Sequence, residues 1–321
     1  MLEQSLDIST VLVTGATGFI GSRLVSLLGE SGFRVRVYSR HCHRFSPQLQ
    51  IEEESWFRGD LHNQESLAVA LNGVDAVFHV AGVAHSNDSS EEEMFRTNSR
   101  GTNDVFSAAA LAGVKRFVFF SSILASRPQT SAYAASKRSA EDILLAHDYL
   151  GTQVVILRSA NVYGPGMQGN IATFIRWIRS GFFPSLPRLE NTFPLISVQD
   201  LCATAIACAI DDLADKQVYV YTVTDGERYT PTRIEAAIHK LAGREPSTFR
   251  IPRWLLYVGA KLAHFANNLG VKPNHIGPRL YRNLVDSRFF TDSGNTQSYP
   301  LPPTATFESE LPAIIHALDQ G

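Results

Sequence analysis

A tyrosine and a lysine four residues apart are the side chains of this sequence best suited to chemistry. Tyr133 and Lys137 bound the segment Tyr-Ala-Ala-Ser-Lys, and this spacing puts both on one face of a helix, one turn apart. A phenol with a pKa of about 10 is a poor base at neutral pH, but a neighbouring ammonium group favours the phenolate. We therefore expect Lys137 to lower the pKa of Tyr133, and the pair to exchange a proton with an alcohol or a ketone.

Two serine hydroxyls lie where a ligand would meet this pair. Ser121 and Ser122 follow an apolar run that begins at Arg116 and that we predict to be a strand. In a doubly wound parallel sheet, ligands bind beyond the carboxyl ends of the strands. The sequence contains no Gly-x-Ser-x-Gly segment, so these serines do not indicate a hydrolase.

A glycine-rich turn near the start of the chain predicts dinucleotide binding. The segment Thr-Gly-Ala-Thr-Gly-Phe-Ile-Gly, residues 14–21, follows an apolar strand and opens a helix. Gly15 permits the tight turn, Gly18 lets the backbone approach a pyrophosphate, and Gly21 lets the helix pack closely on the strand. The first turn of that helix presents free N–H groups and a positive dipole end to the anion.

The end of the second strand indicates which dinucleotide binds. An Asp or Glu there would accept from a ribose hydroxyl, whereas an Arg would pair with a 2′-phosphate. This chain has Ser39 and Arg40 there. We therefore expect NADP(H), with NAD(H) as the alternative if Arg40 is only a surface residue. The neighbouring His-Cys-His segment, residues 41–43, lacks further ligands nearby and does not indicate a metal site.

Short apolar runs alternate with segments of helical period, which predicts an α/β fold built on a doubly wound parallel (Rossmann) sheet. The predicted strands are 10–13, 35–38, 55–58, 76–80, 116–120 and 154–157. After Tyr163, glycines and prolines interrupt the alternation. We expect a dinucleotide-binding domain at 1–164 and a smaller substrate-binding region at 165–321, with 194–224 returning to the sheet.

Composition excludes several other classes of protein. The 321 residues carry 29 Lys and Arg against 31 Asp and Glu, a net charge of −2, so binding to nucleic acid through charge is not expected. No apolar run reaches the ~20 residues of a membrane span, and the first ten residues lack a secretory signal. Three cysteines without a Cys-x-x-Cys pattern favour a reducing compartment, so we expect a cytoplasmic protein.

Taken together, the motifs resemble the extended short-chain dehydrogenases/reductases that act on nucleotide sugars. Besides the glycine turn and the Tyr-Lys segment, the matching segments are Gly59-Asp60-Leu61, His79-Val80-Ala81-Gly82, Asn98-x-x-Gly101-Thr102, the LRSANVYGPG run at 157–166 and the ISVQDL run at 196–201. The resemblance covers nearly the whole chain.

The resemblance implies a role for particular residues. Ser122 would position the substrate oxygen, Tyr133 would transfer the proton, and Lys137 would hold the nicotinamide ribose. Asn161, Asn170 and Arg279 are the implied contacts to the sugar or its diphosphate. The implied cofactor contacts are Gly15, Thr17, Gly18, Phe19, Ile20, Gly21, Arg40, Asp60, Leu61, Val80, Ala81, Gly82, Asn98, Ser121, Tyr133, Lys137, Ala160 and Val162.

Departures from the family pattern reduce the number of reactions that we expect. Ile123 and Leu124 replace the Asp-Glu pair of the sugar dehydratases, so elimination of water is not expected. Two reactions of a nucleotide-sugar substrate, both with hydride transfer at the sugar C4, stay open: a 4-keto reductase, favoured by Arg40, and a 4-epimerase. The alternatives are reduction of a non-sugar ketone or aldehyde, and a catalytically idle cofactor-binding protein. The resemblance also implies a homodimer, paired through the helices at 97–111 and 133–149.

Overall fold

Two compact units make up the chain. The computed structural model describes residues 7–40, 53–83, 90–146, 151–180, 185, 187, 191–213, 216–245, 250, 252 and 297–320. The first unit comprises Met1–Ala160, Val198–Val223 and Asp292–Pro302, and the second comprises Asn161–Ser197, Thr224–Thr291 and Pro303–Gly321.

The first unit is built on an eight-stranded parallel sheet, which confirms the predicted fold class. The strands are β1 Thr10–Thr14, β2 Arg34–Ser39, β3 Trp56–Arg58, β4 Ala76–His79, β5 Arg116–Ser122, β6 Gln153–Ser159, β9 Val218–Val223 and β10 Gln297–Ser298. Their order is β10-β9-β6-β5-β4-β1-β2-β3. The chain leaves β1 toward β2 and β3, then returns to β4 on its other side, so the topological switch point lies between β1 and β4.

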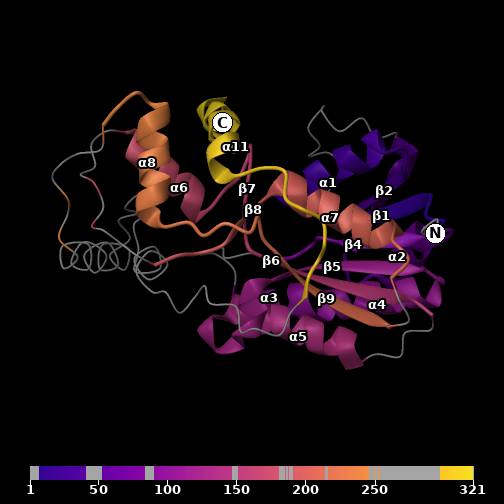
Figure 1. The fold of residues 1–321 in the computed structure, drawn as a ribbon. Helices are drawn as coiled ribbons and strands as arrows, with labels where there is room; N and C mark the ends of the chain where they lie inside the picture. Colours follow the sequence, from indigo (N-terminus) through magenta and orange to yellow (C-terminus); the bar gives the residue numbers. More distant parts are fainter. Residues whose placement is uncertain are drawn as a thin grey trace. The chain divides into compact units, whose positions relative to one another are not determined.

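Helices cover both faces of this sheet (Figure 1). Helices α1, Phe19–Glu30, and α7, Val198–Ile210, pack together on one face. The other face carries α2, Gln64–Leu71, α4, Gly101–Leu111, and α5, Ala132–Ala146. A short helix, α3, Glu91–Phe95, leads into a π-helical turn at Arg96–Arg100 that continues directly into α4.

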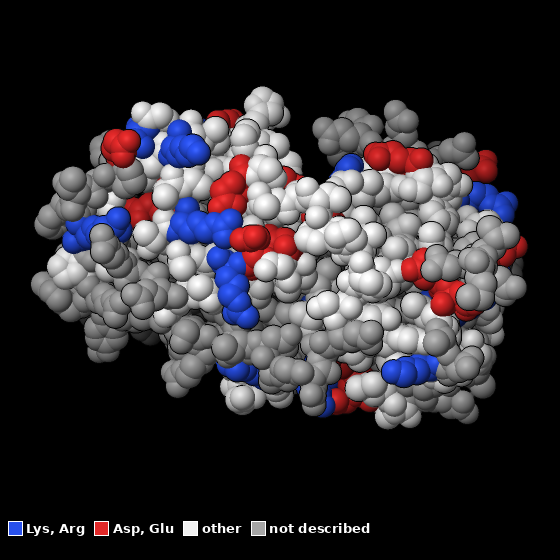
Figure 2. Space-filling view, viewed as in Figure 1, with Lys and Arg blue, Asp and Glu red and all other residues white. Residues whose placement is uncertain are grey.

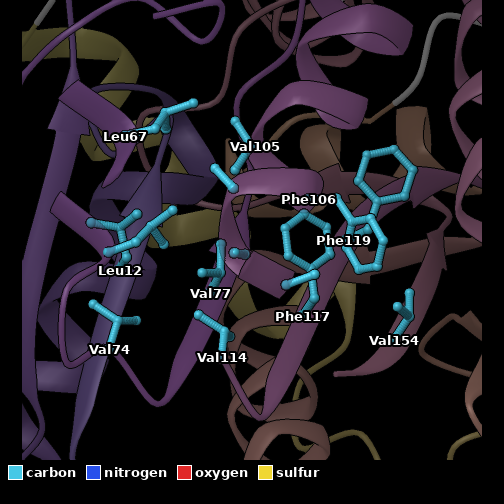
Figure 3. Close-up of a cluster of buried hydrophobic side chains, with 14 of the residues drawn as sticks. Leu12, Leu67, Val74, Val77, Val105, Phe106, Val114, Phe117, Phe119 and Val154 are labelled. Carbon is cyan, nitrogen blue, oxygen red and sulfur yellow. The ribbon is translucent and has the colours of Figure 1, made fainter. Parts of the chain in front are cut away.

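The core beneath α2, α4 and α5 explains why these strands are apolar on both faces. Alternate strand residues, among them Val77, Phe117 and Phe119, point into this cluster (Figure 3). Their neighbours, such as Phe78 and Val118, are equally buried and point to the opposite face. The Phe106 ring of α4 meets the Phe117 ring edge-on, with the centroids 5.2 Å apart. Truncation of such a phenylalanine to alanine costs about 3–5 kcal/mol of stability, so this cluster fixes the sheet that carries the site.

The second unit contains a separate two-stranded sheet. Strand β7, Asn161–Tyr163, pairs in parallel with β8, Leu195–Ser197. Only part of the segment 194–224 therefore joins the large sheet, through β9, because β8 pairs with β7 instead. Among the described residues of this unit, the helices are α6, Asn170–Arg179, α8, Pro231–Leu241, and α11, Phe307–Gln320.

A buried carboxylate organises the second unit. Asp225 accepts hydrogen bonds from the hydroxyls of Tyr163, at 3.3 Å, and Tyr229, at 2.8 Å. The backbone N–H of Phe307, the first residue of α11, donates to the Tyr229 hydroxyl at 3.1 Å. Burial raises the pKa of Asp225 above its usual range. Because its polar partners come from β7, from the segment before α8 and, through Tyr229, from α11, this one cluster ties the unit together.

The surface carries both signs of charge. On the face in Figure 2, Lys and Arg side chains are interspersed with Asp and Glu side chains, as expected from a net charge of −2. Among the described residues, every helix is too short or too polar to cross a lipid bilayer.

Candidate active site

The glycine turn after β1 is packed so closely against neighbouring backbone that side chains do not fit at Gly15 and Gly21. Gly15 has a φ of +71°, and a Cβ there would lie 2.6 Å from the backbone nitrogen of Ala81. A Cβ on Gly21 would collide with the Gly15 carbonyl oxygen and lie 2.8 Å from the Cα of Ala16. Gly18 caps α1 without a side-chain hydrogen bond. The first turn of α1 therefore presents backbone N–H groups that no capping side chain covers, as a pyrophosphate site requires.

The turn after β4 brings the neighbouring part of the site close to Lys137. A Cβ on Gly82 would lie 3.3 Å from Lys137 Nζ and 3.0 Å from Asn98 Oδ1. Asn98 is fully buried in the π-helical turn. Gly82, Asn98 and Lys137, which are far apart in the sequence, therefore meet at the carboxyl edge of the sheet beside the switch point. Both glycines are required by close packing within the protein, because a Cβ on Gly15 would meet the Ala81 backbone and a Cβ on Gly82 would crowd Asn98 and Lys137.

The structure brings the hydroxyls of Ser122 and Tyr133 into hydrogen-bond contact. Ser122 ends β5, and its Oγ accepts from the backbone N–H of Leu124 at 3.2 Å, which caps a short 3₁₀ helix at Ile123–Ser126. Tyr133 lies in the first turn of α5. The strand end and the helix start therefore place the two hydroxyls together.

Burial, rather than charge, dominates the ionisation of this pair. Lys137 Nζ donates to the Phe120 carbonyl oxygen at 2.8 Å and lies 4.8 Å from the centre of the Phe119 ring. Burial lowers the pKa of Lys137 to about 8, although the Glu141 carboxylate opposes this shift. Burial also raises the pKa of Tyr133 to about 12, although the hydrogen bond to Ser122 lowers it in part. The expectation that Lys137 lowers the pKa of Tyr133 is therefore wrong, because burial raises this pKa and the hydrogen bond to Ser122 opposes the shift only in part.

A buried ion pair supports the site from behind, and the sequence analysis missed it. The Glu141 side chain is fully shielded from solvent and accepts from Arg158 Nη2 at 2.6 Å and Nε at 3.0 Å. The Ser121 hydroxyl, predicted as a cofactor contact, donates to Glu141 at 2.5 Å. One sequence signal was available, since Glu141 lies four residues after Lys137 and therefore on the same helix face.

The predicted adenosine contacts lie at the ends of β2 and β3. Arg40 is exposed just after β2, and Ser39 pairs in register with Arg58 of β3. The carbonyl oxygen of Asp60 accepts from the Tyr38 hydroxyl at 2.8 Å. Asp60 also borders an open depression of about 540 Å³, whose other lining residues are His62, Asn63, Gln64, Glu65 and Arg96. Leu61 packs against Gly101 of α4, where an added Cβ would lie 3.0 Å from Leu61 Cδ1.

The remaining predicted contacts belong to other parts of the chain. Thr17, Phe19 and Ile20 lie on the glycine turn and in the first turn of α1, Val80 and Ala81 follow β4, and Ala160 follows β6. Asn161 and Val162 form part of β7 in the second unit, and Asn170 begins α6 there. The Asn170 side chain, Arg279 and the His-Cys-His segment at 41–43 lie outside the described residues.

Comparison with known proteins agrees with this geometry. Residues 11–223 match the NAD dependent epimerase/dehydratase family. A ceramide reductase of Caulobacter vibrioides is 34% identical over 279 residues, which cover 86% of this chain and 84% of that protein. A UDP-glucose 4-epimerase of Vibrio cholerae is 29% identical over 276 residues, which cover 79% of this chain and 82% of that protein.

Among solved structures, MoeE5 in complex with UDP-glucose and NAD has a similar fold. Its TM-score is 0.69 at 22% identity, and the match covers 97% of this chain and 99% of MoeE5. At that identity the likeness concerns the fold, whereas the family match rests on the sequence itself. The chain belongs to the NAD dependent epimerase/dehydratase family, and is an oxidoreductase-type enzyme of the extended short-chain dehydrogenase/reductase class, as its motifs predict.

Proposed function

We propose that this protein transfers hydride between a nicotinamide dinucleotide and a secondary alcohol or ketone carbon, with Tyr133 moving the hydroxyl proton. The observation that carries this proposal is the contact between the Ser122 and Tyr133 hydroxyls, one helix turn from the buried Lys137 ammonium. The dinucleotide would lie on the turns at Gly15 and Gly82 and would supply or accept the hydride.

The ionisation of Tyr133 favours the reductive direction. With a pKa of about 12, the phenol keeps its proton at neutral pH and is ready to donate it to a carbonyl oxygen. Ser122 would donate a second hydrogen bond to that oxygen and so fix its position. The Lys137 ammonium would stabilise the phenolate that remains after proton transfer.

A nucleotide-diphosphate sugar is the first candidate substrate, with hydride transfer at the sugar C4. Support comes from the resemblance to the Vibrio cholerae UDP-glucose 4-epimerase and from the UDP-glucose in the MoeE5 structure. A 4-keto reductase is preferred over a 4-epimerase, because Arg40 favours NADP(H) over NAD(H) and Tyr133 is protonated. Asn161, Asn170 and Arg279 are the proposed contacts to the sugar and diphosphate.

A ketone of the ceramide class is the second candidate substrate. It is favoured by the ceramide reductase of Caulobacter vibrioides, which at 34% identity is more similar to this chain than the epimerase is at 29%. The hydride and proton transfers at Ser122 and Tyr133 would be the same. A catalytically idle protein is disfavoured, because Ser122, Tyr133 and Lys137 are all present and come together.

Turnover assays separate these candidates. Stoichiometric oxidation of NADPH by a UDP-4-keto sugar supports the sugar reductase, interconversion of UDP-glucose and UDP-galactose without net oxidation supports the epimerase, and oxidation of NADPH by a 3-keto-ceramide in detergent micelles supports the lipid reductase. Tyr133→Phe should lower turnover at least ~100-fold, within the range that general acid catalysis supplies. Tyr219→Phe, which removes a hydroxyl from β9, is the matched control. Turnover of Tyr133→Phe within a few fold of wild type would refute the catalytic assignment.

The proposed quaternary state is a homodimer formed by the helices at 97–111 and 133–149. Support comes from two apolar side chains, Leu111 on α4 and Leu145 on α5, which are 78% and 46% exposed. Light scattering after size-exclusion chromatography should give twice the mass of one chain, and Leu111→Lys with Leu145→Lys should reduce it to the mass of a monomer.

A further inference from the structure

A single histidine lies between the glycine turn and the helix that carries the catalytic tyrosine. His79 ends β4 and is fully buried. Its Nδ1 lies 2.8 Å from the Thr14 hydroxyl, and its Nε2 lies 3.0 Å from the Thr102 hydroxyl. Both ring nitrogens are therefore engaged with side chains, one from β1 and one from α4.

The hydrogen bonds around this ring fix its tautomer. The Thr102 hydroxyl donates its only proton to the Asn98 carbonyl oxygen, at 2.7 Å, so it must accept from His79 at its Nε2–H. In the neutral ring Nδ1 then lacks a proton and accepts from the Thr14 hydroxyl. Burial, with the nearby Lys137 charge, lowers the pKa of His79 to about 3. The imidazole is therefore neutral, with one donor and one acceptor that cannot exchange roles while Thr102 holds its bond.

One end of this arrangement supports the glycine turn. Thr14 directly precedes Gly15, and its hydroxyl also accepts from the backbone N–H of Ala81 at 3.3 Å. The Ala81 backbone nitrogen is also the atom that a Cβ added to Gly15 would meet first, at 2.6 Å. The acceptor nitrogen of His79 therefore holds the ends of β1 and β4 together where the dinucleotide would lie.

The other end reaches the first turn of α5. The Asn98 side chain accepts from the Val83 backbone N–H at 2.7 Å, and it donates to the Val83 carbonyl and to the Ser136 hydroxyl, both at 3.0 Å. Ser136 in turn donates to the Tyr133 carbonyl oxygen at 2.9 Å. Hydrogen bonds thus run from Thr14 through His79 and Thr102 to the Asn98 carbonyl oxygen, and from the Asn98 side chain through Ser136 to the backbone of Tyr133.

We propose that His79 is a positioning residue, whose neutral ring sets the distance between the dinucleotide turn and the helix turn that carries Tyr133. This inference rests on the proposed hydride-transfer function and adds to it a residue that touches neither substrate nor reacting atoms. The Thr14 bond would govern dinucleotide binding, and the Thr102 bond would govern the placement of Tyr133 for proton transfer.

Replacing His79 with each of two amide residues tests its hydrogen bonds to Thr14 and to Thr102 separately. An asparagine places an amide oxygen near the position of Nδ1 and keeps the bond from Thr14, whereas a glutamine places an amide N–H near the position of Nε2 and keeps the bond to Thr102. His79→Phe keeps a ring and removes both bonds. The matched control is Thr152→Val, because the buried Thr152 hydroxyl donates to the Val114 carbonyl oxygen at 2.6 Å at the opposite, amino edge of the sheet.

The experiment measures dinucleotide Kd by NADPH fluorescence and kcat at saturating dinucleotide, with the melting temperature of each variant. The loss of one such hydrogen bond corresponds to about a tenfold effect. We expect His79→Asn to keep Kd within about threefold and lower kcat about tenfold, His79→Gln to do the reverse, and His79→Phe to change both. Thr152→Val should lower the melting temperature but leave Kd and kcat unchanged.

Three outcomes would overturn the proposal. Unchanged Kd and kcat in His79→Phe would do so, and so would losses in all three His79 variants that follow the melting temperature alone, as in a purely structural role. If wild type binds neither dinucleotide, the proposed function fails as a whole, which is distinguishable from failure of the His79 variants alone. If His79→Phe does not fold, Thr14→Val and Thr102→Val make the same comparison, since each removes one end of the path.

Discussion

The Ser121 hydroxyl donates to the Glu141 carboxylate at 2.5 Å, in a position closed to solvent directly behind the proposed catalytic residues. Ser121 precedes Ser122, and Glu141 lies one helix turn beyond Lys137. The same carboxylate binds Arg158 through two nitrogens. One buried charge therefore supports the strand end that carries Ser122 and the helix face that carries Lys137.

Removing this charge should destabilise the protein strongly. Glu141→Gln keeps the size of the side chain but removes the negative charge that Glu141 places against the Arg158 guanidinium, which is only 14% exposed. Loss of one partner of a buried ion pair costs about 3–5 kcal/mol. Asp142→Asn, which breaks the exposed Arg138–Asp142 pair on the same helix, should cost less than about 1 kcal/mol. Urea unfolding of both variants tests this prediction. Equal losses of stability in the two variants would show that the fold does not depend on the Glu141 charge.

The pH dependence of reduction should report the ionisation of Lys137. Its pKa of about 8 means that its charge is lost as the pH rises above that value. Tyr133, with a pKa of about 12, keeps its proton over the same range. We therefore expect kcat/KM for ketone reduction to fall above pH ~8. In Lys137→Arg this fall should disappear, because a guanidinium stays charged; the same fall in both proteins would assign it to another group.

The burial of Lys137 also predicts in which direction the stability of the protein changes with pH. Because the folded pKa of Lys137, about 8, lies below its ordinary value of 10.5, the unfolded chain binds more protons between these values. Its contribution to the free energy of unfolding therefore rises with pH across this window, by roughly 3 kcal/mol. Denaturant unfolding at pH 7.5 and 10.5, compared between wild type and Lys137→Met, isolates this term. A difference between the two proteins that does not change with pH would contradict it.

The sequence predicts the sheet well because its strands are apolar on both faces, as helix-covered parallel strands must be. It places Ser122, Tyr133 and Lys137 in one site because strand order and helix period decide which residues meet. It does not predict the raised pKa of Tyr133 or the Glu141–Arg158 pair, since both depend on how much water remains after packing. Nor does it show that β8 pairs with β7, because a three-residue strand carries too few residues to specify its partner.

Two glycines of the first unit should respond oppositely to alanine. Gly15 has a φ of +71°, and its Cβ would lie 2.6 Å from the Ala81 nitrogen, so Gly15→Ala should cost about 1–3 kcal/mol and abolish measurable dinucleotide binding. Gly29 lies within α1, where an added Cβ meets nothing within 4 Å. Gly29→Ala should therefore stabilise the protein by about 0.5–1 kcal/mol. Thermal unfolding with and without dinucleotide checks both, and retained binding in Gly15→Ala would contradict the placement of the cofactor.

The proposed preference for NADP(H) depends on an arginine at the carboxyl end of β2. Arg40 is exposed there, and a guanidinium binds a phosphate through two parallel hydrogen bonds. Removing a charge-assisted contact of this kind costs about 1.5–3 kcal/mol, which is roughly a 10- to 150-fold rise in Kd. We expect Arg40→Ser to weaken NADPH binding by this amount and to leave NADH binding unchanged, since NADH has no 2′-phosphate.

Arg34 provides the matched control for this prediction, because it begins the same strand at the opposite edge of the sheet, where it donates to the Ser9 hydroxyl at 3.2 Å. Arg34→Ser removes an equal charge and should leave both dinucleotides unaffected. If Arg34→Ser weakens NADPH binding as much as Arg40→Ser does, the effect comes from net charge. If Arg40→Ser weakens NADH and NADPH equally, the arginine supports the turn after β2 instead, and the expected cofactor becomes NAD(H).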